Sequence, residues 1–134
     1  MSSGVDEAEE VYRAYNSAEN AHDVDRLGGL VAGDLVVVVN GRPAIASAED
    51  DQVAMERLFQ RYPDYRRDIE QVVGRGDRAA VCWRMRGTPA APAEEALDIP
   101  GCSVVRVEGG RIIEASLYYE GRALDRLLAE GSTR

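Results

Sequence analysis

Apolar residues recur at helical spacing in the first part of the chain. Between residues 5 and 18 they form one stripe, made of Val5, Ala8, Val11, Tyr12, Tyr15 and Ala18. Ser3 precedes this stripe and can cap the helix, whose first turns are rich in acidic residues. The spacing therefore predicts an amphipathic helix that packs one face inward. A second, short helix is expected at about 24–31, where glycines weaken or end it.

The pattern then changes to a strand and a further helix. Residues 35–39 are a β-branched apolar run, which predicts a buried strand that ends at the turn Asn40-Gly41. Ser47 is expected to cap the next helix, whose first turn is acidic, and Pro63 is expected to end it. The expected buried side of that helix carries Val53, Leu58, Phe59 and Tyr62.

The second half of the chain has the alternation of long strands separated by turns. Strands are expected at 65–73, 78–88, 98–107 and 111–119, followed by a short helix at about 122–129. This order predicts an α+β fold, in which helices pack on the concave face of a curved, mostly antiparallel sheet. Such an arrangement leaves a hollow that suits a small ligand. The 134 residues are expected to form a single domain over 1–134.

Charge limits the expected partners. The formal net charge is −8, and all 16 basic residues are arginine, which indicates the GC-rich coding bias found in actinobacteria. An acidic chain is unsuited to nucleic acid and to anionic membranes. The longest apolar run, 35–39, is too short to span a membrane, and residues 1–10 hold no apolar signal core. A cytoplasmic location is therefore expected.

The cysteines and the single histidine predict neither a metal site nor a disulfide framework. Cys82 and Cys102 form no CxxC or Cys/His pattern, and His22, expected in a surface turn, cannot build a metal site alone. If the strands on either side of the loop near Pro89 pair as a hairpin, Cys102 is expected opposite about residue 84 rather than opposite Cys82. Both cysteines are expected to be reduced, small apolar residues. No metal or organic cofactor is expected.

Four segments in chain order resemble one known family. The first segment, 62–73, includes Pro63-Asp64, and the second, 76–88, runs from a Gly-Asp turn to Gly87-Thr88. The third is the predicted hairpin at 106–114, and the fourth is the closing segment at 118–128. Together they resemble the SnoaL-like polyketide cyclase family. The resemblance implies the cone-shaped nuclear-transport-factor-two-like fold, which ketosteroid isomerases and limonene-epoxide-hydrolase-like enzymes share. It also implies a homodimer that forms through the sheet.

The resemblance supplies three candidate catalytic residues. Arg13-Ala14-Tyr15 is similar to the isomerase pattern in which a tyrosine on the first helix donates to an oxyanion, so Tyr15 takes that role. Asn40 lies at the end of the first strand, where relatives carry a general base, and it can offer only a polar contact. Glu120 lies where the family has its terminal aspartate and is a candidate acid or base. The alternatives are a core role for Tyr15 and a helix-capping charge for Glu120.

A pocket wall is expected from the strand 78–88. Val81, Trp83 and Met85 alternate there with Arg84 and Arg86, so the apolar face suits the pocket and the arginine face suits solvent or a dimer partner. On the arginine face, cross-strand ion pairs with other charged strand residues are expected, among them Arg106 and Glu114. Substrate contacts are expected at Tyr12, Phe59, Trp83, Met85, Asp98 and Tyr119.

The leading hypothesis is a SnoaL-like enzyme of natural-product (antibiotic or other polyketide) biosynthesis. It would act as a cyclase or isomerase on a small apolar organic molecule, by acid/base chemistry and by holding a flexible chain in a reactive conformation. One alternative is a non-catalytic binding or carrier protein for an apolar metabolite, and another is a partner domain that uses only its sheet face. A further alternative is an epoxide-hydrolase-like enzyme, which needs two acidic residues and an arginine to activate water and open an epoxide. Arg84 or Arg86 could supply its arginine, but Met85 and Leu117 occupy the acid positions.

Overall fold

One curved sheet and three helices make up residues 6–121, the part of the chain that the computed structural model describes. The helices are α1 (Glu7–Asn20), α2 (Val24–Gly29) and α3 (Ala48–Arg61). The strands are β1 (Val31–Val39), β2 (Arg42–Ile45), β3 (Arg66–Arg75), β4 (Arg78–Gly87), β5 (Leu97–Glu108) and β6 (Arg111–Tyr119).

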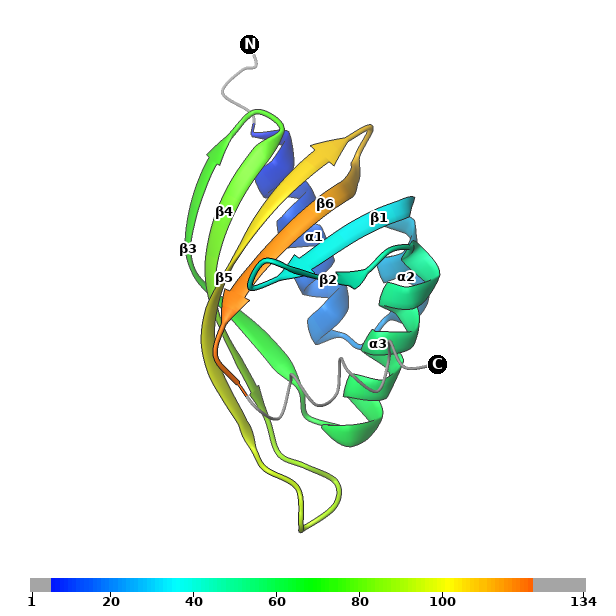
Figure 1. The fold of residues 1–134 in the computed structure, drawn as a ribbon, viewed down its shortest axis with the longest axis vertical. Helices are drawn as coiled ribbons and strands as arrows, with labels where there is room; N and C mark the ends of the chain where they lie inside the picture. The colour runs from blue at the N-terminus through cyan, green and yellow to red at the C-terminus, as the bar shows by residue number, and fades with distance from the viewer. Residues whose placement is uncertain (1–5, 122–134) are drawn as a thin grey trace.

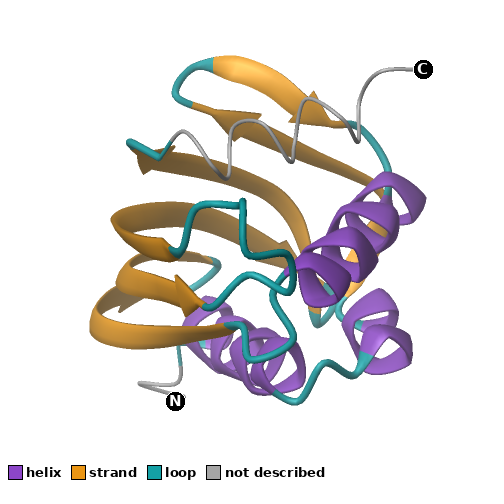
Figure 2. Ribbon diagram, turned by 90° about the horizontal axis from the view of Figure 1, so that it is seen from below, coloured by secondary structure: helices purple, strands orange, loops and turns teal. Residues whose placement is uncertain are grey.

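The sheet has the strand order β2-β1-β6-β5-β4-β3. β1 and β6 are parallel, and every other pair is antiparallel. The sheet is thus mostly antiparallel, as the sequence predicts. The long strands bend strongly, and the helices lie on the concave side (Figure 1). Figure 2 shows the same arrangement from below, with the helices across the open side of the curved sheet. The expected α+β fold with helices on the concave face is confirmed.

The helix phases follow from the sequence, with one correction. The stripe of α1 is buried as expected at Ala8, Tyr12, Tyr15 and Ala18. Ser47 caps α3, because its Oγ accepts from the backbone N–H of Asp50 at 3.0 Å. The prediction that Val53 is buried is wrong, because this residue is 41% exposed. The buried stripe of α3 is instead Asp51, Met55 and Leu58, at the spacing i, i+4, i+7.

In the first half of the chain, three elements differ from the sequence pattern. β1 begins at Val31 rather than at residue 35, because Val31 pairs with Ile112 of β6; an irregularity separates this pair from the continuous parallel pairing of Val36 to Val39. β2 was not expected, and it exists through antiparallel pairing with β1. α2 ends at Gly29. The Ser3 cap and the expected helix at 122–129 lie outside the described residues.

The expected position of Cys102 is also corrected. Cys102 lies opposite Cys82, and Arg84 lies opposite Pro100. The hairpin runs from Gly87 to its partner Leu97. Its centre is therefore residue 92, whereas the expected pairing requires residue 93. Because a shift of one residue in the centre moves every cross-strand partner by two, the two cysteines become direct neighbours.

Close packing between β4 and β5 sets the position of Trp83. Its ring lies against Gly101, where an added Cβ would come within 2.3 Å of the ring, so only glycine fits. The indole Nε1 donates to the Ser103 hydroxyl at 2.8 Å. Trp83 is thus a fully buried side chain with a satisfied hydrogen-bond donor. Within the described residues, no helix is long and apolar enough to cross a membrane.

Candidate functional site

A pocket opens between the concave face of the sheet and the helices α1 and α3. Its lining residues come from α1, α3 and all six strands, so the pocket suits a small organic molecule. Most of the lining is apolar. The lining residues with a polar side-chain group, within the part of the chain that the structure describes, are Tyr12, Tyr15, Asp51, Arg67 and Ser103.

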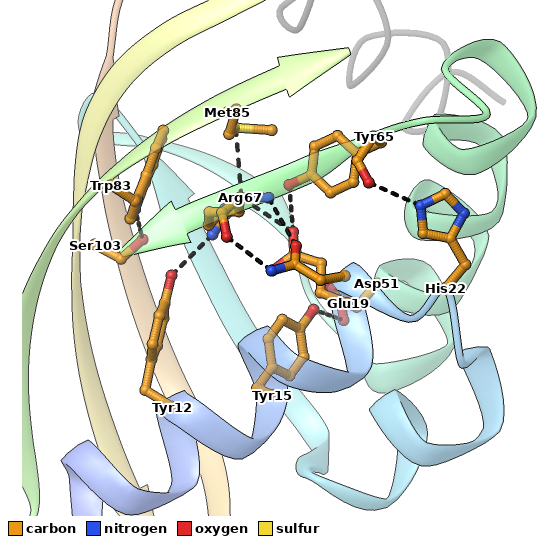
Figure 3. Close-up of polar contacts among 11 residues, drawn as sticks. Tyr12, Tyr15, Glu19, His22, Asp51, Tyr65, Arg67, Trp83, Met85 and Ser103 are labelled. Carbon is orange, nitrogen blue, oxygen red and sulfur yellow. Dashed lines mark hydrogen bonds and ion pairs between the residues drawn. The ribbon is translucent and has the colours of Figure 1, made fainter. Parts of the chain in front are cut away.

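Asp51 and Tyr15 form a buried pair at the wall of this pocket. The Tyr15 hydroxyl, on α1, donates to Asp51 Oδ2, on α3, at 2.8 Å (Figure 3). Burial raises the pKa of Asp51 from its ordinary value of 3.8 to about 6, although the hydrogen bond from Tyr15 opposes the rise. Burial and the neighbouring Asp51 charge hold the pKa of Tyr15 well above its usual range. The pair therefore combines a carboxylate that titrates near neutrality with a neutral hydroxyl.

The sequence analysis missed Asp51, although a signal exists. It lies in the acidic first turn of α3, where a carboxylate normally faces solvent and the helix N-terminus. However, it is four residues before Met55 and seven before Leu58, so it shares their inward face. Helical phase could have identified this position, whereas charge alone pointed to the surface.

Arg67 is the centre of a second buried group. Its guanidinium, on β3, donates from Nη1 to the Tyr12 hydroxyl at 2.9 Å and lies 3.4 Å from Glu19 Oε2. The same group stacks on the Trp83 ring, 4.4 Å from its centroid. Glu19 is fully buried and also accepts from the Tyr65 hydroxyl. Figure 3 shows these side chains converging from α1, β3, β4 and the segment before β3.

Two contacts hold Arg67 in place. The side-chain amide of Asn20, at the end of α1, makes two hydrogen bonds with the backbone of Arg67. Its Nδ2 donates to the Arg67 carbonyl oxygen at 3.0 Å, and its Oδ1 accepts from the Arg67 N–H at 2.7 Å. The sulfur of Met85 accepts from Nη2 at 3.5 Å. Burial lowers the pKa of Arg67, but Glu19 and Tyr12 raise it more, so it stays well above its ordinary value. Arg67 is therefore a fixed cation balanced by Glu19, which leaves Asp51 as the uncompensated acid of the pocket lining among residues 6–121.

The structure places the predicted site residues in three settings. Tyr12, Tyr15 and Met85 line the pocket. Trp83 and Tyr119 are core residues whose rings lie 6.3 Å apart, outside that lining. Phe59 also lies outside it, stacked on the His22 ring at 4.1 Å between centroids.

Asn40, Asp98 and Glu120 lie apart from the pocket lining. Asn40 adopts a positive φ of 50° and binds the backbone of Tyr119 through both groups of its amide, at 2.8 and 3.1 Å. Asp98 is on the convex face, where its hydrogen bond with Arg84, at 2.6 Å, lowers its pKa. Glu120 is exposed. Arg106 and Glu114 form the expected cross-strand ion pair, at 3.2 Å.

Ligands for a metal do not gather in the described residues. No three His, Cys, Asp or Glu side chains come together there in a way that could hold an ion. The polar groups of the pocket lining are instead the Asp51 carboxylate with its partner Tyr15, the Arg67 guanidinium, and the hydroxyls of Tyr12 and Ser103. This set can move a proton at Asp51 and offer positive charge and hydrogen bonds to an oxygen.

Comparisons with known proteins agree with this architecture. A family model described as a SnoaL-like domain matches residues 12–115. IdmH from Streptomyces antibioticus, a candidate polyketide cyclase, is 20% identical with a TM-score of 0.74, over 91% of this chain and 98% of IdmH. A candidate SnoaL-like polyketide cyclase from Jannaschia sp. CCS1 is 17% identical with a TM-score of 0.75, over 100% of this chain and 99% of that one.

A further similar structure is an LEH-like epoxide hydrolase from M. tuberculosis. It is 19% identical with a TM-score of 0.74, over 93% of this chain and 91% of that one. Among curated proteins, none matches the sequence significantly. At these identities the solved structures establish a shared fold, and the chemistry must be argued from the pocket.

Proposed function

The chain belongs to the family of SnoaL-like domains, and on that premise we propose that it is an acid–base enzyme acting on a small, mostly apolar carbonyl compound. The observation that carries the proposal is the buried pair of Asp51 and Tyr15 at the wall of an apolar pocket. A carboxylate with a pKa near 6 is well matched to proton transfer near neutral pH. The reaction class is a ring closure or an isomerisation of a polyketide-like substrate.

Asp51 acts as the base in this proposal. Within the described residues, Tyr15 is the hydrogen-bond partner of its carboxylate, through Oδ2, so Oδ1 is left for the substrate. Oδ1 takes a proton from a carbon next to a carbonyl, and the electron pair moves onto the carbonyl oxygen. In an isomerisation, the protonated Asp51 returns the proton to another carbon. In an aldol ring closure, the enolate carbon bonds to a second carbonyl carbon, the π electrons of that carbonyl move onto its oxygen, and Asp51 gives its proton to the resulting alkoxide.

Arg67 and its neighbours stabilise the oxygen that gains negative charge. The guanidinium and the hydroxyls of Tyr12 and Ser103 belong to the same pocket lining. A fixed cation and hydroxyl donors in an apolar surrounding lower the energy of an enolate more than water does. The apolar remainder of the lining holds a flexible chain folded, which supplies the proximity that a ring closure needs.

A second candidate reaction is the hydrolytic opening of an epoxide. The observation in its favour is a buried acid–arginine–acid set, made of Glu19, Arg67 and Asp51. These positions differ from the strand positions considered in the sequence. Here Asp51 would take a proton from water, and the hydroxide would bond to an epoxide carbon as the ring C–O bond at that carbon breaks. The protonated Asp51 would then give its proton to the released ring oxygen, which leaves a diol. The two reactions are distinguished by product mass, because hydrolysis adds one water molecule whereas isomerisation leaves the mass unchanged.

The pH dependence of turnover tests the role of Asp51 as a base. The value of kcat/KM is expected to rise with pH through about 6, because only the deprotonated carboxylate accepts a proton. Below that pH the rate falls roughly tenfold per pH unit. In Tyr15→Phe the midpoint moves to higher pH, because the hydrogen bond that lowers the pKa of Asp51 is gone. A profile that is flat between pH 5 and 7.5 contradicts the assignment.

We also propose that two copies associate through the convex face of the sheet. Of the large apolar residues that are exposed within residues 6–121, four lie on strands: Val36, Val73, Val104 and Tyr118. The strand pairing and the alternation of burial place these four on the convex face. Sedimentation at micromolar concentration should show a dimer, and Tyr118→Arg should shift it to monomer. The matched control is Val53→Arg, which changes an exposed valine on α3. A wild-type monomer under these conditions contradicts the proposal.

A further inference from the structure

Two free thiols face each other at the middle of the sheet. Cys82 on β4 and Cys102 on β5 are direct cross-strand partners, both free and both half-buried. Residues on either side of them, Val81, Trp83 and Ser103, are buried on the concave side. Because side chains alternate along a strand, the thiols point to the convex face.

The pairing geometry suits a disulfide. Directly opposed residues in an antiparallel pair have Cα atoms about 4.5–5.5 Å apart, inside the roughly 4.4–6.8 Å that a disulfide accepts. The Cβ atoms of such pairs are about 4.5–5.5 Å apart, a range whose lower end meets the roughly 3.5–4.5 Å of a disulfide. The thiols also interact already: burial, followed by the charge and hydrogen bond of Cys82, raises the pKa of the Cys102 thiol.

We propose that Cys82 and Cys102 are a reversible oxidation site that closes to an intramolecular disulfide across β4 and β5. The oxidant is a low-molecular-weight disulfide. One protein thiolate attacks a sulfur of the small disulfide and releases one small thiolate. The second protein thiolate then attacks the protein sulfur of the mixed disulfide and releases the other. The two protons lost by the cysteines pass to the two small thiolates, which become thiols, and the small disulfide is thereby reduced by two electrons.

The position of the bond explains why it would be reversible and what it would affect. Both cysteines are only half-buried on the sheet surface, and accessible disulfides are reduced readily. The disulfide would link β4 to β5 at the cross-strand pair that lies between the pairs Trp83–Gly101 and Val81–Ser103. On the concave side, Trp83 and Ser103 are hydrogen-bonded to each other, and Trp83 supports Arg67. Oxidation on the convex face thus acts on the strands that form the floor of the pocket.

The test is oxidation of the reduced, folded full chain by oxidised glutathione, followed by intact-mass analysis and alkylation of remaining thiols. Wild type should become two hydrogen atoms lighter, carry no glutathione and lose both alkylatable thiols. Excess reduced glutathione should restore them. In Cys82→Ser and Cys102→Ser, the remaining thiol has no partner, so a single glutathione adduct should persist. If a serine variant does not keep its circular dichroism spectrum, the alanine variant replaces it.

Three results would overturn the proposal. The first is a wild type that still has two alkylatable thiols after oxidation. The second is a wild type that stops at glutathione adducts, because a neighbouring thiol would displace the glutathione. A disulfide that joins two chains, seen on non-reducing gels, also contradicts an intramolecular bond. Because Tyr118, on the face proposed for association, lies opposite Cys102, that result would mean that thiols of two copies meet there.

Discussion

Replacing Asp51 with asparagine is expected to lower kcat by roughly a hundredfold to ten-thousandfold, the range for loss of a general base. The asparagine side chain has nearly the same shape, and its carbonyl oxygen can still accept from the Tyr15 hydroxyl, which donates to Asp51 at 2.8 Å. The pocket therefore stays intact while the proton acceptor is lost. Steady-state turnover and ligand binding, measured on the same preparation, separate the two effects.

The matched control is Asp50→Asn, which changes the preceding, exposed carboxylate of the same helix turn. It should leave kcat within about twofold and cost a few tenths of a kcal/mol at the helix N-terminus. If Asp51→Asn keeps full turnover, Asp51 is not the base. If wild type binds apolar carbonyl compounds without converting them, the carrier function is favoured over the enzyme.

The same substitution should make the protein more stable at pH 8 relative to wild type. Asp51 has a folded-state pKa of about 6, above its ordinary value of 3.8, so the folded state holds the proton more tightly. Its contribution to stability is fully present below pH 3.8 and is lost as the pH rises through 6. The loss is about 3 kcal/mol, and asparagine does not titrate. Denaturant unfolding at a series of pH values should show the gap between variant and wild type growing over this range; parallel curves would contradict the burial of an ionised Asp51.

Replacing Glu19 with glutamine is expected to lower the free energy of unfolding by roughly 3–5 kcal/mol, a large part of the stability of a typical domain. Glu19 is fully buried, and its carboxylate lies 3.4 Å from the guanidinium of Arg67, which is only 6% exposed. The variant leaves that cation in the interior without its counter-charge. Denaturant unfolding at pH 7 measures the loss.

Glu9→Gln is the matched control, on the same helix and with the same chemical change. Glu9 pairs with Arg13 at 2.9 Å near the surface, where such a pair contributes less than about 0.5 kcal/mol. The double variant Glu19→Gln with Arg67→Met should recover much of the lost stability, because no unpaired charge remains. If the two glutamine variants are equally stable, Arg67 must reach water, and the buried cluster is wrongly described.

Much of the fold is readable along the chain because local rules decide it. The stripe of α1, the Ser47 cap of α3 and the long strands can each be recognised from a sequence pattern of a few neighbouring residues. The family resemblance rests on the same local segments, and the fold it implies agrees with the curved sheet. Register is already harder: an error of one residue in the centre of a loop hid the direct pairing of Cys82 with Cys102.

The polar residues of the pocket depended on the folded structure. Tyr15 and Asp51 are 36 positions apart, and Tyr12 and Arg67 are 55 apart, so no local pattern joins either pair. A charged residue read from sequence belongs at the surface, because burying it alone costs several kcal/mol. Glu19 and Arg67 can be buried because each meets the other, and only the packing of α1 against β3 brings them together. Local patterns could therefore predict most of the elements and the inward face of α1, whereas β2 and the charges that could work inside the pocket were decided by their distant partners.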